Sequence, residues 1–300
     1  MKLYRSLLYV PADNPHRVEK ALNSNADVVI LDLEDAVAVS KKESSRRSLN
    51  SLLKGSNRDN TFVRVNAMST AFCLEDIAAA VEAGAIGISL PKVESAEEVY
   101  SIDWLLNQLE IKEGILPGSI ELIPVIESGR GLHHAVSILE CVKRVRRAGL
   151  GVGDLALEMN FELESDQGEA IPYKRELILA SSAAKIEAPL DSVYLDIKNL
   201  NGLKSSCLES KRMGFQGRRI IHPSHIDIVN ASYSPTDSEI EWARKTILAF
   251  NDAEKAGTAA IRVNDSLVDY PIAYRAKTIL TRLAEIEQNS VNLLSETREI

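Results

Sequence analysis

Several features that define other classes of protein are missing from this chain of 300 residues. It has only three cysteines, Cys73, Cys141 and Cys207, and no CxxC pair, so neither a disulfide framework nor a cysteine-based zinc site is expected. No apolar run approaches the length of about eighteen residues that a membrane span needs, and the first residues lack the pattern of a signal peptide. The sequence therefore predicts a soluble, cytoplasmic protein with no membrane partner.

A basic excess is also absent, because 43 acidic residues stand against 35 basic ones and the formal net charge is −8. Nucleic-acid-binding proteins normally carry a basic face, so no nucleic-acid partner is expected. A small anionic ligand remains compatible, since local basic clusters can override the net charge. No glycine-rich dinucleotide fingerprint follows the first predicted strand, and there is no internal repeat.

Apolar segments alternate with amphipathic ones along most of the chain, and hydrophobic residues make up 45% of it. Short apolar runs bounded by turn residues are typical of strands buried on both faces, as in a parallel sheet covered by helices. Eight such alternations in about 230 residues predict an α/β fold of the (β/α)8 type, a TIM barrel, with a doubly wound open sheet as the alternative. The predicted strands cover residues 6–11, 27–33, 61–66, 86–91, 120–127, 148–155, 191–197 and 219–222.

The end of the chain does not continue this alternation. Thr236 to Lys255 predicts a long helix opened by a capping signal, 261–271 a short hairpin around Asn264-Asp265, and 272–286 a final helix. We therefore divide the chain into a barrel domain, residues 1–230, and a C-terminal helical and hairpin extension, residues 231–300.

Two carboxylates lie at the ends of predicted strands. Glu127 ends a long apolar run just before Ser-Gly-Arg-Gly, and Asp154 ends the apolar, glycine-rich segment that follows. Side chains at the carboxyl ends of barrel strands meet at one mouth, and hard oxygen ligands suit Mg²⁺. The alternative is that each acid only caps the helix after it. The pairing of the two favours a metal site.

Charged residues are rarely buried in strands without a partner. Arg64 is expected to lie across the mouth from the two carboxylates, where its guanidinium could grip a carboxylate with two hydrogen bonds. Arg5 and Lys92 are interpreted as partners of acids such as Asp32 or Glu34. His222, at the end of the eighth predicted strand, is expected to line the mouth.

Eight motifs occur in the order and spacing of one known family. They are RSLLYVP (5–11), DLEDAV (32–37), RVNA (64–67), LPKV (90–93), PVIES (124–128), VGDL (152–155), GFQGRRIIHP (214–223) and SLVDYP (266–271). The chain resembles the citrate lyase β-subunit-like lyases, within the pyruvate-handling aldolase barrels, over roughly residues 2 to 285. The resemblance implies the same TIM barrel that the alternation predicts.

The resemblance also assigns roles to single residues. Glu127 and Asp154 match Mg²⁺ ligands, and Arg64 matches an arginine that contacts the acyl portion of the substrate. Asp269 matches the catalytic acid-base aspartate, which in relatives is delivered by the C-terminal segment of a neighbouring subunit, so a homo-oligomer (a trimer or hexamer) is implied. The positions that hold a coenzyme A thioester are matched by Tyr9, Lys20, Ile221 and His222.

The implied activity is Mg²⁺-dependent retro-Claisen cleavage of a 3-hydroxy-3-carboxyacyl-CoA to acetyl-CoA and an α-keto acid. Citramalyl-CoA, malyl-CoA and citryl-CoA are the candidate substrates. One alternative is a citrate lyase β subunit that acts on a carrier-protein thioester. A non-catalytic subunit that binds coenzyme A or a keto acid is another, and a CoA-free, Mg²⁺-dependent aldolase is a third.

Overall fold

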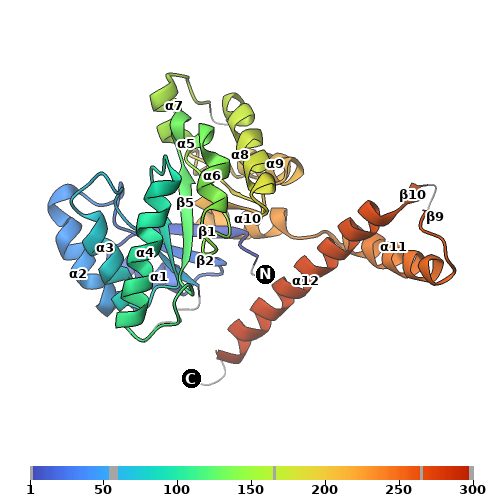
Figure 1. Cartoon of the computed structure of the whole chain (residues 1–300), viewed down its shortest axis with the longest axis horizontal. Coiled ribbons are helices and arrows are strands. Elements are labelled where there is room, and N and C mark those ends of the chain that lie inside the picture. Colours follow the sequence, from blue (N-terminus) through green and yellow to red (C-terminus); the bar gives the residue numbers. More distant parts are fainter. Residues whose placement is uncertain (1–2, 54–59, 165–166, 264–265, 297–300) are drawn as a thin grey trace. The chain divides into compact units, whose positions relative to one another are not determined.

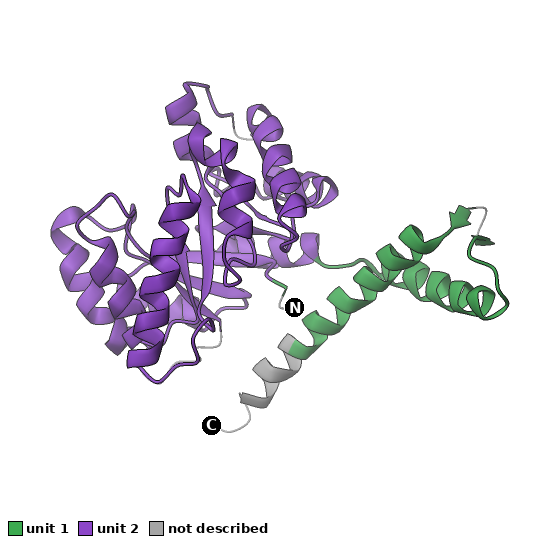
Figure 2. Cartoon of the chain, viewed as in Figure 1, with its two compact units in different colours: residues 1–3, 234–300 green, residues 4–233 purple. Residues whose placement is uncertain are grey.

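The computed structural model describes residues 3–53, 60–164, 167–263 and 266–296. Its backbone contacts divide the chain into two compact units (Figure 2). The larger unit is Tyr4–Tyr233, and the smaller one is Ser234–Ile300 together with Met1–Leu3. The expected hairpin turn at Asn264-Asp265 lies outside the described residues.

The larger unit contains a closed barrel of parallel strands that runs in chain order from β1 to β8, with β8 pairing back to β1 (Figure 1). The predicted (β/α)8 barrel is confirmed. Its strands are β1 (Ser6–Pro11), β2 (Val28–Asp32), β3 (Thr61–Arg64), β4 (Gly87–Leu90), β5 (Glu121–Ile126), β6 (Gly149–Leu150), β7 (Leu190–Asp191) and β8 (Gly217–Ile220).

Helices follow the strands and cover the outside of the barrel (Figure 1). They are α1 (Pro15–Leu22), α2 (Lys42–Leu53), α3 (Cys73–Glu82), α4 (Ala96–Lys112), α5 (Gly129–His133), α6 (Ala135–Glu140), α7 (Val152–Met159), α8 (Ile171–Ala183), α9 (Leu200–Met213) and α10 (Ile226–Tyr233). Three short 3-10 turns lie between them: η1 (Val39–Lys41), η2 (Gly168–Ala170) and η3 (Pro223–His225). No helix in the described ranges is both long and apolar enough to cross a membrane.

The strands are apolar on both faces because each face packs into a separate core. In β2 the side chains of Val29 and Leu31 belong to the core beneath the helices. Val28 and Ile30 point the other way, as alternation along a strand requires, and fill the inside of the barrel. Each such side chain contributes about 1.5–3 kcal/mol when it is fully buried. The other members of the inner cluster are Tyr4, Leu7, Phe62, Ile123 and Leu190.

A buried ionic network lies at the amino end of the barrel, the end opposite the mouth. Arg147 donates from Nε to Glu121, the first residue of β5, at 2.7 Å and pairs with Glu187 at 2.7 Å. Its guanidinium carbon lies 3.9 Å from the ring centre of Tyr4. A buried charge needs such partners, because an isolated one is strongly disfavoured away from water. The amino end is therefore filled by side chains, and the opposite end is left for chemistry.

The bounds predicted for the seventh and eighth strands were wrong. β7 ends at Asp191 instead of residue 197, because the main-chain N–H of Ser192 donates to the Asp191 side chain at 2.8 Å and not to a neighbouring strand. β8 begins and ends two residues earlier than predicted. It stops before His222, whose ring accepts a hydrogen bond from Ser224 N at 3.2 Å as η3 begins.

Two stretches around the expected metal residues also differ from prediction. The segment 148–155 was expected to be a strand, but β6 ends at Leu150 and α7 begins at Val152, with Gly151 as its N-cap. The helix expected after Glu127 is broken at His134 into α5 and α6. α10 was not predicted at all.

The smaller unit contains two long helices joined by a hairpin. α11 (Asp237–Lys255) begins at Thr236, whose hydroxyl accepts from Glu239 N while the Glu239 carboxylate accepts from Thr236 N, so the capping signal is confirmed. β9 (Ile261–Val263) pairs antiparallel with β10 (Ser266–Val268), and α12 (Tyr270–Glu296) runs ten residues beyond its predicted end at 286. This unit has its own apolar cluster of Phe250, Val268 and Ala273.

Candidate active site

A pocket of about 450 Å³ opens at the carboxyl ends of the barrel strands. Its lining comes mainly from the ends of strands and the segments after them, which is where the active sites of barrel enzymes lie. Five of the residues singled out from the sequence lie in this lining: Tyr9, Arg64, Glu127, Asp154 and Ile221.

Lys20 and His222, which were also expected at the site, are not in the lining of the pocket. Lys20 is exposed in the last turn of α1, and Arg17, one turn earlier on the same helix, lines the pocket in its place. His222 is exposed, and its Nδ1 lies 2.7 Å from Ser224 Oγ. Within the same motif, Arg219 and Ile221 line the pocket instead.

Glu127 is buried in the turn that follows β5. Its Oε1 accepts a hydrogen bond from Lys92 N at 2.8 Å. Its Oε2 and Cβ press against Gly151, where any β-carbon would collide with them. The pKa of Glu127 is raised to about 8, mainly by burial and also by the neighbouring carboxylate of Asp154, while the charge of Arg219 works in the opposite direction.

Asp154 lies in the first turn of α7 and not at the end of a strand. Its negative charge is favourable there because the N-terminus of a helix carries a partial positive charge. Among the described residues no group of three or more histidine, cysteine or acidic side chains could hold a metal. The pair of Glu127 and Asp154 nevertheless fits Mg²⁺, which typically uses one or two carboxylates and completes its shell with water and substrate oxygens.

Arg64 makes the two-bond grip that the sequence predicted, but with a carboxylate of its own chain. Its Nε and Nη2 donate to Asp32 at 2.8 and 2.6 Å, and its Nη1 lies 2.9 Å from Glu34. Burial works to lower the pKa of Arg64, but the hydrogen bonds and charge of Asp32 raise it above the ordinary value. The ring of Tyr9 lies beneath the guanidinium, with 4.9 Å between the ring centre and Cζ.

Glu34 and Lys92 form a second charged pair at the mouth. The Lys92 Nζ lies 3.6 Å from Glu34 Oε1, so the interpretation of Lys92 as the partner of an acid is confirmed. Burial, with help from the charge of Asp35, raises the pKa of Glu34 to about 7. Burial alone would lower the pKa of Lys92, but Glu34 and Asp154 raise it. Arg5 pairs instead with Asp27 at 2.7 Å.

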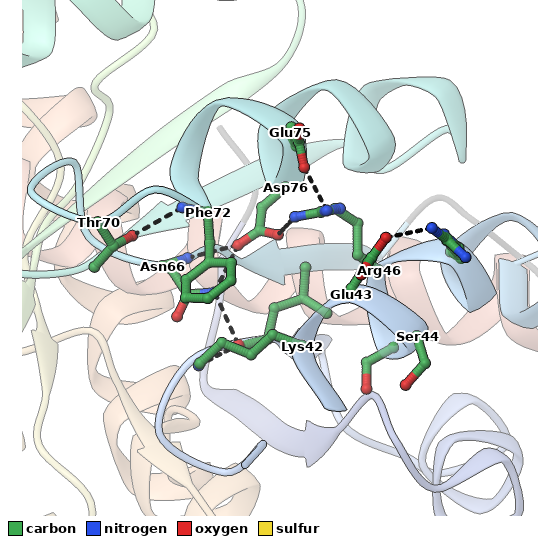
Figure 3. A network of polar contacts seen from close by, with 12 residues as sticks. Lys42, Glu43, Ser44, Arg46, Asn66, Thr70, Phe72, Glu75 and Asp76 are labelled. Atoms are coloured by element: carbon green, nitrogen blue, oxygen red, sulfur yellow. Dashed lines mark hydrogen bonds and ion pairs between the residues drawn. The ribbon is translucent and has the colours of Figure 1, made fainter. Parts of the chain in front are cut away.

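A network outside the pocket holds the turn that carries Asp32 and Glu34 (Figure 3). The ammonium group of Lys42, in α2, is buried and donates to the carbonyl oxygens of Leu33 and Glu34, both at 2.9 Å. Asn66 also donates to Leu33 O, at 3.0 Å. The turn is therefore held through its backbone, while the carboxylates of Asp32 and Glu34 pair with Arg64.

The same network reaches α3 through Asp76, which is completely buried. Asp76 Oδ2 accepts from both the main-chain and side-chain nitrogens of Asn66, at 3.1 and 2.6 Å, and its other oxygen pairs with Arg46 at 3.3 Å (Figure 3). Glu75, which is exposed, forms an ion pair with the same guanidinium group. The RVNA motif thus contributes Arg64 to the pocket and Asn66 to the support behind it.

Arg219 lines the pocket and was not identified from the sequence. It lies on the inner face of β8, two residues before Ile221, and its Nη2 donates to the carbonyl oxygen of Leu150. The period of two along a strand would have placed residues 219 and 221 on one face. The sequence does not show which face of the strand points into the barrel, so the alternation alone could not identify Arg219 as a pocket residue.

Asp269 belongs to the smaller unit, between β10 and α12. It is half-buried, and its carboxylate accepts a hydrogen bond from Ile272 N at 3.3 Å while its carbonyl oxygen accepts from Ala273 N at 2.9 Å. It therefore caps the first turn of α12. Its assignment as the catalytic acid-base group stays a prediction.

A parallel barrel with carboxylates and a guanidinium gathered at its carboxyl-end mouth defines an α/β-barrel protein with a site for a small acidic ligand. The chain belongs to the HpcH/HpaI aldolase/citrate lyase family, whose model matches residues 5–223. The resemblance inferred from the eight motifs is confirmed.

Individual relatives extend over nearly the whole chain. The citrate lyase subunit beta of Escherichia coli (strain K12) is 33% identical over 280 residues, which cover 93% of this chain and 92% of the relative. A (3S)-malyl-CoA thioesterase of Cereibacter sphaeroides is 34% identical over 268 residues, covering 89% and 90%. Among solved structures, protein CitE from Mycobacterium tuberculosis, in complex with magnesium, acetoacetate and coenzyme A, is 30% identical with a TM-score of 0.76 and covers 93% of this chain and 98% of its own.

Proposed function

We propose that this protein is a Mg²⁺-dependent lyase that cleaves a 3-hydroxy-3-carboxyacyl-CoA into acetyl-CoA and an α-keto acid. The observation that carries the proposal is the meeting of Glu127, Asp154 and Arg64 in one pocket at the mouth of a barrel. The magnesium and coenzyme A in the CitE structure, together with family membership, support the choice of metal and thioester.

Each residue of the pocket has a task in this reaction. Glu127 and Asp154 would hold Mg²⁺, which when bound supplies a Lewis acid for the hydroxyl and carboxylate that become the keto acid. Arg64 presents its charge where the thioester oxygen becomes negative. Since Asp32 already engages two of its nitrogens, Arg64 is fixed in place before substrate arrives. Such preorganisation saves reorganisation energy during the reaction.

Asp269 is proposed as the acid-base group that takes the proton of the substrate hydroxyl and returns one to the acetyl-CoA enolate. The family resemblance implies that this aspartate comes from a neighbouring subunit, so we propose a homo-oligomer in which the C-terminal extension, residues 231–300, completes the site of another copy. Tyr9, Arg17 and Ile221 line the pocket and are the candidates for contact with the thioester. The scattered cysteines support a cytoplasmic location.

A citrate lyase β subunit that acts on a carrier-protein thioester is the second candidate. It is favoured by the match to the Escherichia coli subunit over 93% of this chain. The two functions share the pocket and differ in what carries the acyl group. A non-catalytic binding subunit would bind the keto acid or coenzyme A and cleave neither thioester.

The test is an assay of the purified protein with Mg²⁺ and citramalyl-CoA, malyl-CoA or citryl-CoA, in which acetyl-CoA, keto acid and free coenzyme A are measured. We expect one thioester to yield acetyl-CoA and keto acid in equal amounts, with loss of activity on chelation. Asp154→Asn should abolish this cleavage. Glu158→Gln, which removes an exposed charge one turn further along α7, should keep it.

Free coenzyme A without acetyl-CoA would mean thioester hydrolysis and would overturn the lyase assignment. Cleavage of carrier-protein thioesters alone would select the second candidate. If no thioester is cleaved but the keto acid still binds with Mg²⁺, the binding-subunit alternative holds.

A further inference from the structure

Arg219 is a buried cation whose charge acts on the carboxylate of Glu127 without forming an ion pair with it. It is 6% exposed, makes no ion pair with any residue in the described ranges, and its Nε has no hydrogen-bond partner there. Buried guanidinium groups are normally paired with carboxylates, since a lone buried charge is costly. The contact that holds Arg219 is to a neutral group, the carbonyl oxygen of Leu150 at the end of β6. A costly arrangement of this kind at a pocket calls for a functional reason.

This contact bridges a weak part of the barrel. β6 and β7 each have two residues, and a single pair, Gly149 with Leu190, connects them in register. Arg219 extends from β8 past β7 to β6. It lies close to the backbone of Gly149, where a β-carbon would be 3.4 Å from Cζ and Nε of Arg219, in ordinary van der Waals contact. The guanidinium therefore adds a hydrogen bond between β8 and β6 where backbone pairing is sparse.

Leu150 leads directly into the turn that carries Asp154. On one side of this turn, Gly151 N donates to Ile126 O at 2.9 Å, one residue before Glu127. On the other side, Leu150 O accepts from Arg219. Val152 N also donates to Ser192 Oγ, just after β7, at 3.4 Å. The segment between β6 and α7 is thus tied to the strand before Glu127, to β8 and to the residue after β7. Loss of the Arg219 contact is expected to loosen the position of Asp154 relative to Glu127.

We infer that Arg219 is a positioning residue of the proposed metal site, which sets the place of Asp154 relative to Glu127 through its hydrogen bond to Leu150. The inference rests on the proposed function, because it takes these two carboxylates to be the Mg²⁺ ligands. It adds a residue that does not itself touch the metal. Loss of such a supporting contact typically lowers metal affinity about 10- to 100-fold.

The charge of Arg219 acts on Mg²⁺ binding in two opposite ways. It repels a divalent cation, but it also favours the ionised form of Glu127 that a cation needs. Removal of the charge therefore has no fixed sign. A lysine at position 219 keeps the charge and loses the fork-shaped contact with Leu150, so Arg219→Lys separates positioning from charge.

The experiment is calorimetric titration of Mg²⁺ into the full-length protein without substrate, on wild type, Arg219→Met and Arg219→Lys. We expect Arg219→Met to bind Mg²⁺ about 10- to 100-fold more weakly. Arg219→Lys keeps the charge but loses the planar fork that fits the carbonyl, so it should also bind more weakly. The control is Arg212→Met, which removes an exposed arginine that also donates to a main-chain carbonyl oxygen, that of Leu208 in α9, but lies outside the pocket lining; it should leave the Mg²⁺ affinity unchanged.

Equal or tighter Mg²⁺ binding by Arg219→Lys would overturn the inference. If Arg219→Met does not fold, Arg219→Lys decides alone. Failure of the proposed function is a separate outcome: wild-type protein would then bind no Mg²⁺, or Glu127→Gln would bind it as wild type does.

Discussion

Lys92 donates its main-chain N–H to the carboxylate of Glu127 while its own backbone is in the left-handed region, with a φ of +54°. That conformation is unfavourable for a residue with a β-carbon, by about 1–2 kcal/mol. The LPKV turn therefore holds strain at the point where it orients the buried acid of the site. Strain of this kind persists only where the surrounding structure imposes it.

This strain can be measured with two substitutions at Lys92. Both Lys92→Gly and Lys92→Ala remove the ammonium group and keep the N–H, but only glycine relieves the left-handed conformation. We expect the glycine variant to be more stable than the alanine variant by about 1 kcal/mol. Urea unfolding of the two proteins measures the difference. The reverse order would show that Lys92 is not left-handed in solution.

Gly151 is expected to be required for Mg²⁺ binding because a methyl group there would displace the Glu127 carboxylate. Gly151→Ala should weaken Mg²⁺ binding by at least about 10-fold, the scale of lost support around a metal ligand. Gly153→Ala is the matched control in the same turn, since a β-carbon at Gly153 meets nothing within 4 Å. Equal Mg²⁺ affinities in the two variants would contradict the prediction that the Glu127 carboxylate needs the space left by the missing side chain of Gly151.

Asp76 and Glu75 both pair with Arg46 in the network of Figure 3, but we expect their removal to lower the free energy of unfolding by unequal amounts. Asp76→Ala breaks a completely buried pair and leaves the main-chain N–H of Asn66 without its acceptor, so it should reduce the free energy of unfolding by about 3–5 kcal/mol. Glu75→Ala removes an exposed partner and should cost less than about 1 kcal/mol. Thermal or urea unfolding compares them. Similar costs would mean that Asp76 is not buried as described.

The ion pairs of Asp191 allow a prediction of how the free energy of unfolding changes at low pH. It pairs with Lys174 at 3.2 Å and with Arg218, and although burial opposes ionisation, these cations lower its pKa to about 2. A lowered pKa stabilises the fold above the unfolded value of about 3.9, and that contribution is lost as pH falls toward 2. Asp191→Asn should therefore be less stable at pH 7, and the deficit should shrink below pH 4 in urea titrations. A constant deficit would contradict the charge pairing.

Asp269→Asn should lower kcat about 10²- to 10⁴-fold while Mg²⁺ and thioester binding remain, as expected for an acid-base group. If the residue is delivered by a neighbouring copy, mixing the inactive Asp269→Asn and Glu127→Gln proteins should restore part of the activity. In such a mixture some sites receive a normal Glu127 from one chain and a normal Asp269 from the other. Turnover near wild type in Asp269→Asn alone would refute its role, and no recovery on mixing would refute delivery between subunits.

Much of the barrel could be predicted from the sequence because its strands are continuous apolar runs, buried on both faces. β1 was placed at the residues where it occurs, and Glu127 was placed at the end of its strand, which in the structure stops one residue before it. The predictions were wrong where strands are too short to leave a pattern. β6 and β7 have two residues each, so the apolar VGDL segment resembled a strand although it begins α7.

The pocket was harder to predict because it depends on how neighbouring strands line up. Asp32 pairs with Arg64 since β2 and β3 bring the two residues opposite each other, which requires the register. Arg17 and Arg219 were missed because the sequence does not fix which turn of α1, or which face of β8, looks into the barrel. Roles that follow from the type of residue could be predicted from the sequence. Roles that depend on the direction of a side chain could not.

The two-residue strands β6 and β7 also have a consequence for how the barrel opens. Amide hydrogens exchange with solvent through local openings, and these start where few backbone hydrogen bonds hold neighbouring segments together. In this barrel that place is the boundary between β6 and β7, next to the turn that bears Asp154. A ligand that joins Asp154 to Glu127 would tie the segment after β6 to the end of β5, the strand on the other side of β6. Occupancy of the site therefore anchors β6 on one side only, and isotope exchange should slow at the β5–β6 pairs more than at the single pair between β6 and β7.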